Sequence, residues 1–150
     1  MVKYFCSSDI HSFYSCWKTA LDNSGFDINN SEHKVIICGD LFDRGNEACE
    51  CLEFVKTLAE QNRLIYIRGN HEDLLAQAVN QLLNSSVSPH HFSNGTIKTI
   101  RQFTNSTEHN VLFLNYNPKE FNKTMRSVLD LIDNTAVDYF ELGDTVFVHG

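Results

Sequence analysis

The sequence predicts an α/β fold built on a parallel sheet, and two features of its apolar pattern carry this prediction. Three short apolar runs, at residues 2–7, 33–39 and 64–67, are each followed by a stretch with helical spacing of apolar side chains. A chain that alternates strand and helix in this way forms parallel strands joined by right-handed crossovers. In addition, residues 35–38 are all apolar, which is typical of a strand covered on both faces.

Three helices are expected after these strands, at residues 12–23, 47–61 and 72–83. Ser12 is expected to cap the first helix, because a hydroxyl at that position accepts a hydrogen bond from the first turn. The apolar spacing also predicts which side chains face the core. They are Phe13, Trp17, Ala20 and Leu21 in the first helix, and Cys51, Phe54, Val55 and Leu58 in the second.

The second half of the chain has a different pattern. Residues 84–95 are polar and predict a loop, whereas residues 96–103 and 118–132 have helical spacing. Residues 111–114 are ambiguous between strand and helix. Residues 137–141 and 145–148 flank a Leu-Gly-Asp turn, and this arrangement predicts an antiparallel hairpin.

Charge and hydropathy exclude two classes of partner. The 150 residues carry 12 basic and 19 acidic side chains, for a formal charge of −7, without a basic patch. Nucleic acid is therefore not expected as a partner. No apolar run reaches the roughly 18 residues that a membrane span requires, so no membrane is expected either.

The cysteines and the N-terminus predict a cytoplasmic location. The five cysteines are an odd number, and their spacing matches neither a zinc ribbon nor a redox motif. We expect them to be free thiols in a reducing compartment. The first six residues run directly into a strand, which is unlike a signal peptide.

Polar motifs follow all three predicted strands. The motifs are Asp9-Ile10-His11, Gly39-Asp40-Leu41-Phe42-Asp43-Arg44-Gly45 and Arg68-Gly69-Asn70-His71-Glu72, and a further His149 ends the hairpin. Taken singly, Asp40 and Asn70 are also good helix caps. Three such motifs at three successive strand ends instead predict a ligand-binding edge, because parallel sheets bind ligands beyond their carboxyl ends.

The motifs, in this order, resemble the calcineurin-like metallophosphoesterases. They are most similar to the branch of phosphoprotein phosphatases, bacteriophage lambda-type protein phosphatases and symmetrical diadenosine tetraphosphatases. Asn94-Gly95-Thr96 with Thr99, and the hairpin that leads to His149, resemble further segments of the bacterial and phage members. The resemblance therefore spans the chain, and it implies an αββα sandwich fold.

The resemblance assigns a role to each motif residue. It implies that Asp9 and His11 bind one divalent cation, that Asn70 and His149 bind a second, and that Asp40 bridges both. The cation implied first is Mn²⁺, with Fe or Zn²⁺ as alternatives. The remaining roles are phosphate binding by Arg44 and Arg68, and proton donation by His71 oriented by Asp43.

The chain also departs from the family pattern. Family members carry a further metal-binding histidine in a Gly-His segment downstream of the His-Gly. We therefore expect residues 1–150 to be one metallophosphoesterase domain that is truncated before its last metal-ligand motif, with an incomplete second sheet. The Asn94-Gly95-Thr96 segment lacks a second glycine, and the pair His90-His91 is the single candidate substitute ligand.

The function implied is two-metal hydrolysis of phosphomonoesters, with phosphoserine or phosphothreonine in proteins as the leading substrate. One alternative is dinucleoside polyphosphate hydrolysis, and another is a metal-binding but inactive fragment. The partner expected is a phosphoprotein or a small phosphoester. An exposed sheet edge would also allow an oligomer, because unpaired edges invite pairing with another chain.

Overall fold

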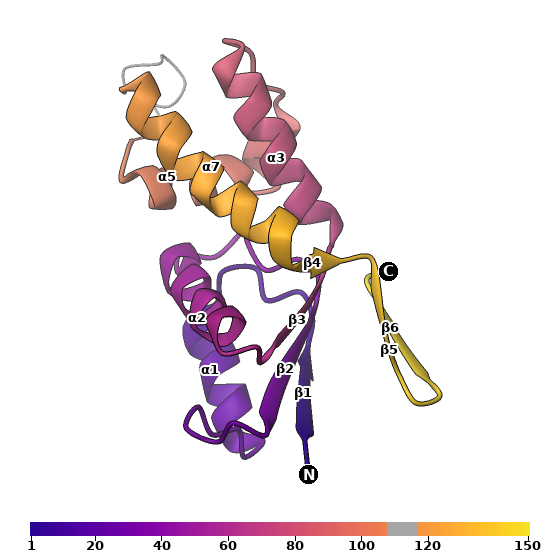
Figure 1. Ribbon diagram of the computed structural model, residues 1–150. Helices are drawn as coiled ribbons and strands as arrows, with labels where there is room; N and C mark the ends of the chain where they lie inside the picture. The colour runs from indigo at the N-terminus through magenta and orange to yellow at the C-terminus, as the bar shows by residue number, and fades with distance from the viewer. Residues whose placement is uncertain (108–116) are drawn as a thin grey trace.

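The computed structural model describes residues 1–107 and 117–150. Its main sheet is parallel, in the order β1-β2-β3-β4 (Figure 1). The strands are β1 (Lys3–Ser7), β2 (His33–Cys38), β3 (Leu64–Ile67) and β4 (Ala136–Val137). The predicted parallel α/β fold is therefore confirmed.

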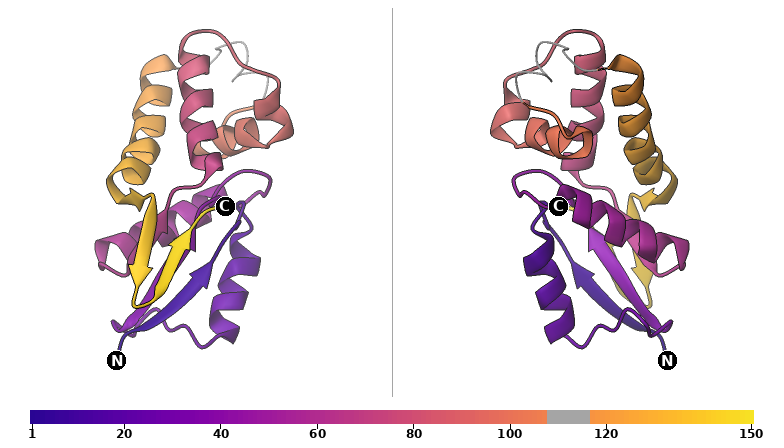
Figure 2. Two further views of the ribbon diagram at one scale, coloured as in Figure 1. Left: turned by 90° about the vertical axis from the view of Figure 1, so that its right-hand side faces the viewer. Right: turned by 90° about the vertical axis from the view of Figure 1, so that its left-hand side faces the viewer.

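Two helices cover one face of this sheet, and a hairpin lies over the other (Figure 1). The helices are α1 (Tyr14–Asn23) and α2 (Ala48–Glu60), and the hairpin consists of β5 (Tyr139–Leu142) and β6 (Thr145–Val148). Figure 2 shows the hairpin crossing in front of the strands. This layering explains the unbroken apolar run of β2, because its side chains are buried on both sides of the sheet.

The larger core lies between the sheet and the helices, and the smaller one lies under the hairpin. Trp17 and Leu21 of α1 are buried in the larger core, as are the four predicted residues of α2. In the smaller core, Ile36 and Ile67 pack with Phe140 of the hairpin. The hairpin is thus a second, two-stranded sheet that faces the first.

The start of α1 differs from the prediction. Ser12 does not cap this helix, because it is buried and has a left-handed φ of 59°. The helix begins at Tyr14 without a side-chain cap. Phe13 is 49% exposed and Ala20 is exposed as well, so their predicted core positions are wrong. Ser12 instead belongs to the loop beside the strand ends. The backbone conformation of this loop overrides the preference of serine for a helix cap.

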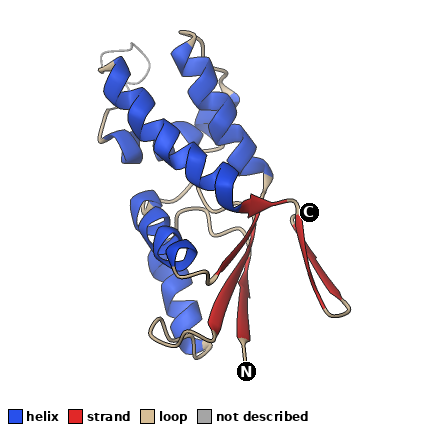
Figure 3. Cartoon of the chain, in the orientation of Figure 1, coloured by secondary structure: helices blue, strands red, loops and turns tan. Residues whose placement is uncertain are grey.

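In the part of the chain that the structure describes, four further helices form a group beyond the carboxyl ends of the strands (Figures 1 and 3). They are α3 (Asn70–Leu83), α4 (His90–Ser93), α5 (Thr96–Thr104) and α7 (Pro118–Thr135). The short α4 lies in the stretch predicted as a loop. The ambiguous residues 111–114 lie outside the described residues.

The hairpin prediction is correct except at its start. Val137 pairs with Ile67 in the main sheet, as part of β4, and the hairpin begins two residues later. Tyr139, Val146 and Val148 of the hairpin are each more than half exposed. Pairing of this hairpin with another chain stays a prediction. Within the two described ranges, no helix is long and apolar enough to cross a membrane.

The packing of α3 leads to a stability prediction. Leu75 is fully buried in the larger core, whereas Leu83 at the end of the same helix is 43% exposed. Leu75→Ala should lower the free energy of unfolding by about 2–5 kcal/mol, because it removes buried apolar contacts and leaves a cavity. Leu83→Ala should cost about 1 kcal/mol or less. Urea denaturation followed by circular dichroism measures both, and equal losses would contradict this packing.

Candidate metal centre

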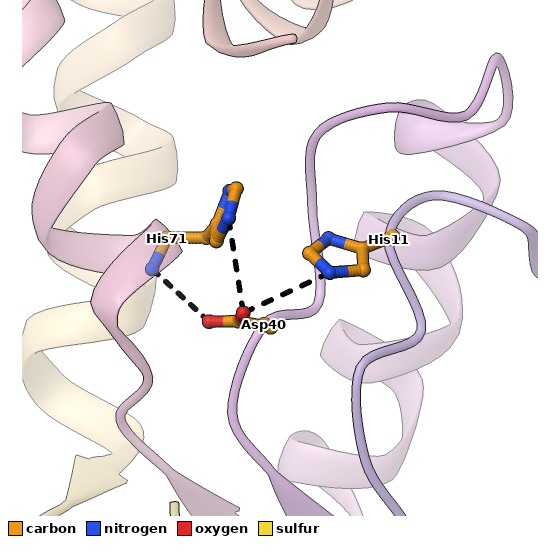
Figure 4. A group of neighbouring side chains, drawn as sticks. All are labelled: His11, Asp40 and His71. Carbon is orange, nitrogen blue, oxygen red and sulfur yellow. Dashed lines mark hydrogen bonds and ion pairs between the residues drawn. The ribbon is translucent and has the colours of Figure 1, made fainter. Parts of the chain in front are cut away.

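Asp40 lies at the centre of the strand-end motifs, immediately beyond β2. Its Oδ2 lies 3.7 Å from His11 Nε2 and 3.8 Å from His71 Nε2 (Figure 4). All three residues are at least 95% buried. Within the described ranges, one ligand atom from each comes within 4.8 Å of the others, as in a metal site. Asp9, which is more exposed, places Oδ1 4.0 Å from His11 Nε2.

The second oxygen of Asp40 faces the two remaining predicted ligands. His149 Nε2 lies 3.4 Å from Asp40 Oδ1 and 3.0 Å from Asn70 Oδ1. His149 reaches this position at the end of β6, whereas Asn70 begins α3. The structure thus brings together all five residues predicted as metal ligands, from four separate segments of the chain.

Backbone carbonyls orient two of the imidazoles. His11 Nδ1 lies 2.9 Å from the Phe42 carbonyl, and His149 Nδ1 lies 2.9 Å from the Cys38 carbonyl. A carbonyl only accepts, so each Nδ1 carries a proton, and in the neutral form of the ring Nε2 would present its lone pair to Asp40.

This donor set fits divalent cations on both sides of Asp40. The Nε2 lone pair of His149 meets only acceptor oxygens at hydrogen-bond distance, and the lone pair of His11 meets the carboxylates of Asp9 and Asp40. Lone pairs that converge in this way repel one another unless a cation lies between them. Mixed oxygen and imidazole ligands suit Mn²⁺, Fe or Zn²⁺.

His71 forms a buried pair with Asp43. Its Nδ1 lies 2.7 Å from Asp43 Oδ2, and the Thr96 hydroxyl donates to the same oxygen over 2.8 Å. The Asp43 backbone N–H in turn donates to the Thr99 hydroxyl over 3.0 Å. The second oxygen, Oδ1, has no hydrogen-bond partner among the described residues. The contact between His71 and Asp43 orients the imidazole so that its Nε2 faces Asp40.

The loops that carry these residues have a strained backbone. Six non-glycine residues have positive φ angles between 49° and 77°. They are Asp9, His11, Ser12, Asp40, Asp43 and Arg44. Each such conformation costs about 1 kcal/mol or more in an L-residue, and strain of this kind concentrates at functional sites.

Glycines allow the loops to approach one another closely. A Cβ on Gly39, whose φ is +76°, would lie 2.5 Å from His149 Nδ1 and 2.7 Å from the Cα of Gly69. A Cβ on Gly69 would lie 2.6 Å from the Asp40 backbone nitrogen. The two Gly residues before Asp40 and Asn70 are therefore required for contact between the two loops.

The comparisons with known proteins agree with this geometry. The family model described as calcineurin-like phosphoesterase matches residues 2–150. The chain belongs to the calcineurin-like phosphoesterase family. This membership confirms the resemblance that the motifs indicate, and it makes a phosphoester hydrolase with divalent metals the general expectation for the site.

Two curated relatives of the chain are named as dinucleoside tetraphosphatases. The asymmetrical bis(5′-nucleosyl)-tetraphosphatase PrpE of Bacillus subtilis (strain 168) is 34% identical over 74 residues, covering 45% of this chain and 30% of the relative. The PrpE protein of Anoxybacillus flavithermus is 38% identical over 48 residues, which cover 32% of this chain and 20% of the relative. The match thus spans less than a third of the length of either relative.

A solved structure in the same fold covers the whole chain. It is a mutant of a cold-active protein tyrosine phosphatase, with a TM-score of 0.58 and 20% identity. The match includes 100% of this chain and 44% of that structure. At this identity, the likeness shows the family fold and nothing of the substrate.

The two arginines predicted to bind phosphate, Arg44 and Arg68, have different surroundings. Arg44 is exposed beside the buried Asp43. Arg68 instead pairs with Asp133 of α7 at 2.6 Å and with Asp73 of α3 at 3.3 Å. The hydrogen bond that Arg68 donates to Asp133 is the main cause of the raised pKa of Arg68. Phosphate binding by Arg68 would therefore require this guanidinium to exchange a carboxylate for the substrate.

The candidate substitute ligands His90 and His91 are not part of the group at Asp40. His90 Nδ1 is hydrogen-bonded to the Ser88 hydroxyl at 2.8 Å, and the His91 ring packs on it with centroids 4.0 Å apart. Burial, followed by the charge of His90, lowers the pKa of His91. Neither histidine belongs to the group of three potential ligands found among the described residues.

Sequence reasoning missed the role of Glu72. This residue is fully buried, and its carboxylate accepts four hydrogen bonds. Oε2 accepts from the Asp40 and Gly69 backbone N–H groups, at 3.0 and 2.7 Å. Oε1 accepts from the Leu41 N–H at 2.9 Å and the Tyr66 hydroxyl at 2.8 Å. The signal was a glutamate three residues after the N-cap, which is the position of a capping box.

Replacement of Glu72 tests this role. Glu72→Gln puts an amide NH₂ where one carboxylate oxygen accepts two hydrogen bonds, so donors would face donors in a buried site. We expect the free energy of unfolding to fall by about 3 kcal/mol. The matched control is Glu53→Gln on α2, whose carboxyl pairs with Lys56 at 71% exposure and should contribute less than about 1 kcal/mol. A Glu72→Gln variant as stable as the control in urea would contradict the role.

Proposed function

We propose that this chain hydrolyses phosphoesters with two divalent cations, held by Asp9, His11, Asp40, Asn70 and His149. The observation that supports this most is the position of Asp40. One carboxylate oxygen faces His11 and the other faces His149 with Asn70. Such a carboxylate is suited to bridge two cations. Several metals suit these ligands, and the metal that is available usually decides which one binds. Mn²⁺ is the first candidate.

The cations, when bound, would neutralise the charge on the phosphoryl oxygens and lower the pKa of a water at the site. The remaining chemistry falls to side chains of the chain itself. The His71 Nε2 faces the same space as Asp40, and Asp43 stabilises the imidazolium through Nδ1. His71 is thereby suited to protonate the leaving oxygen as the ester bond breaks. Arg44 lies exposed next to this pair, where its guanidinium would bind phosphate oxygens.

The substrate favoured by the relatives is a dinucleoside polyphosphate. Both PrpE proteins are named for hydrolysis of bis(5′-nucleosyl) tetraphosphates, and they match this chain at 34% and 38% identity. The motifs themselves favour the phosphoprotein phosphatases, so a phosphoserine or phosphothreonine peptide is the second candidate. The two substrates share the phosphoryl chemistry and differ in what the enzyme must bind around it.

A direct assay tests the proposed hydrolysis. The purified chain is incubated with Mn²⁺ and, in parallel, diadenosine tetraphosphate, a phosphoserine peptide and p-nitrophenyl phosphate. We expect hydrolysis to fall at least about 100-fold in Asp40→Asn, because the bridging charge is lost. Asp130→Asn, on the exposed side of α7, should keep the rate of the original chain.

Each outcome of this assay has a defined meaning. Faster turnover of diadenosine tetraphosphate than of the peptide supports the dinucleoside substrate, and the reverse supports the phosphoprotein. Rates that are equal in the original chain and Asp40→Asn contradict the proposal. If the chain is folded, binds Mn²⁺ and hydrolyses none of the three substrates, it is the inactive metal-binding fragment.

A second variant separates proton donation from metal binding. His71→Gln should lower kcat by about 10²–10⁴-fold, since general acid catalysis typically contributes that much. Mn²⁺ affinity, measured by calorimetry, should change little. The control is His33→Gln at the opposite end of β2. If Mn²⁺ affinity instead falls together with kcat, His71 is a metal ligand, and the role of proton donor is wrong.

A further inference from the structure

Two cysteines lie against each other beneath the candidate metal centre. Cys6 of β1 and Cys38 of β2 have Sγ atoms 3.6 Å apart. Cys6 is opposite Ile36 in the parallel register, and Cys38 lies two residues further along β2. Side chains two residues apart point to the same face of a sheet, so both thiols lie on the face that the hairpin covers.

The two thiols differ in access to solvent. Cys6 is exposed, whereas Cys38 is 9% exposed. The other cysteines, Cys16, Cys49 and Cys51, lie on α1 and α2 across the sheet (Figure 1). A reagent can therefore reach Cys6 first, and Cys38 is the thiol next to it.

We propose that Cys6 and Cys38 form a reversible thiol–disulfide pair, oxidised by a low-molecular-weight disulfide such as oxidised glutathione. The Cys6 thiolate attacks one sulfur of the reagent, which gives a mixed disulfide at Cys6 and releases one glutathione thiol. The Cys38 thiolate then attacks the Cys6 sulfur, which forms the Cys6–Cys38 bond and releases the second glutathione. Two protein thiols are oxidised and one glutathione disulfide is reduced to two thiols, so electrons and protons balance.

Formation of the bond requires movement of the two strands, because Cys38 is offset by two residues from the position opposite Cys6. A disulfide has an S–S length of about 2.05 Å, so the sulfurs must approach by roughly 1.5 Å from their present separation. The second exchange is the step that joins the two protein sulfurs, which lie 3.6 Å apart. The proximity of the two sulfurs makes that step intramolecular, and this favours it over exchange with a second glutathione.

The same movement acts on the metal centre. The Cys38 carbonyl accepts the hydrogen bond that orients His149, and Asp40 follows two residues later. Drawing Cys38 toward β1 disturbs both, so we expect weaker Mn²⁺ binding in the oxidised form. This last step rests on the proposed function, whereas the thiol pair does not.

Intact-mass spectrometry tests the pair without any activity measurement. The chain with Cys16→Ser and Cys49→Ser, which removes the other exposed thiols, is incubated with oxidised glutathione. We expect a loss of about 2 Da, reversed by dithiothreitol, with a Cys6–Cys38 cross-linked peptide after proteolysis. Adding Cys38→Ala should instead trap one glutathione on Cys6, and adding Cys6→Ser should abolish both products.

Other outcomes overturn one part of the inference or the other. A stable glutathione adduct on Cys6 despite an intact Cys38, or no reaction in protein shown to be folded, overturns the thiol pair. A further result is that the disulfide forms while the Mn²⁺ affinity stays within about twofold of that of the reduced chain. In that case the proposed effect of the disulfide on His149 is wrong, and the proposal that Cys6 and Cys38 form a disulfide is supported. Loss of Mn²⁺ binding in the reduced chain as well would point to failure of the proposed function instead.

Discussion

The buried carboxylate of Glu72 holds together the two loops on which the candidate metal centre depends. Its four hydrogen bonds reach the backbone after β2, the backbone after β3 and the hydroxyl of Tyr66. Burial, followed by the charge of Glu72, raises the pKa of Tyr66, so its hydroxyl stays protonated and donates. A carboxylate with four donors is fully satisfied, and it therefore fixes both loops without needing solvent.

Hydrogen-bond acceptors crowd around the buried Asp40 carboxylate, which is unfavourable without a cation between them. Asp40 is 4% exposed and faces two imidazole lone pairs across its two oxygens. The His71 backbone N–H, at the start of α3, donates to Asp40 Oδ1 over 3.0 Å, and this N-terminal position also favours the negative charge. The strained loops and the close glycines add further cost. Bound cations would offset these costs, which fits the observation that several local preferences give way at this one place.

The sequence was sufficient to predict the elements whose local pattern agrees with the fold. The three strand–helix units have strong apolar periodicity, and the motif residues at their ends converge because the strands are parallel. The same reasoning failed at Ser12, where a good capping residue is required by the loop at the strand ends. It also placed Val137 in the hairpin, because two residues of β4 carry too short a pattern to separate from the next strand.

Several contacts between distant residues, outside the motifs, were beyond sequence reasoning. Thr96 and Thr99 bind Asp43 across more than fifty positions, and Arg68 pairs with Asp133 across sixty-five. The proximity of Cys6 and Cys38 depends on the register of two strands. Single-sequence periodicity specifies faces of elements, whereas these contacts depend on how the elements pack.

The central claim is that Asp40 bridges two cations, and anomalous scattering tests it most directly. Crystals of the chain grown with Mn²⁺ and measured at the manganese absorption edge should show two peaks, one on each side of Asp40. One peak should contact Asp9 and His11, and the other should contact Asn70 and His149. No peak at Asp40 under saturating Mn²⁺, or peaks confined to surface carboxylates, would contradict the account.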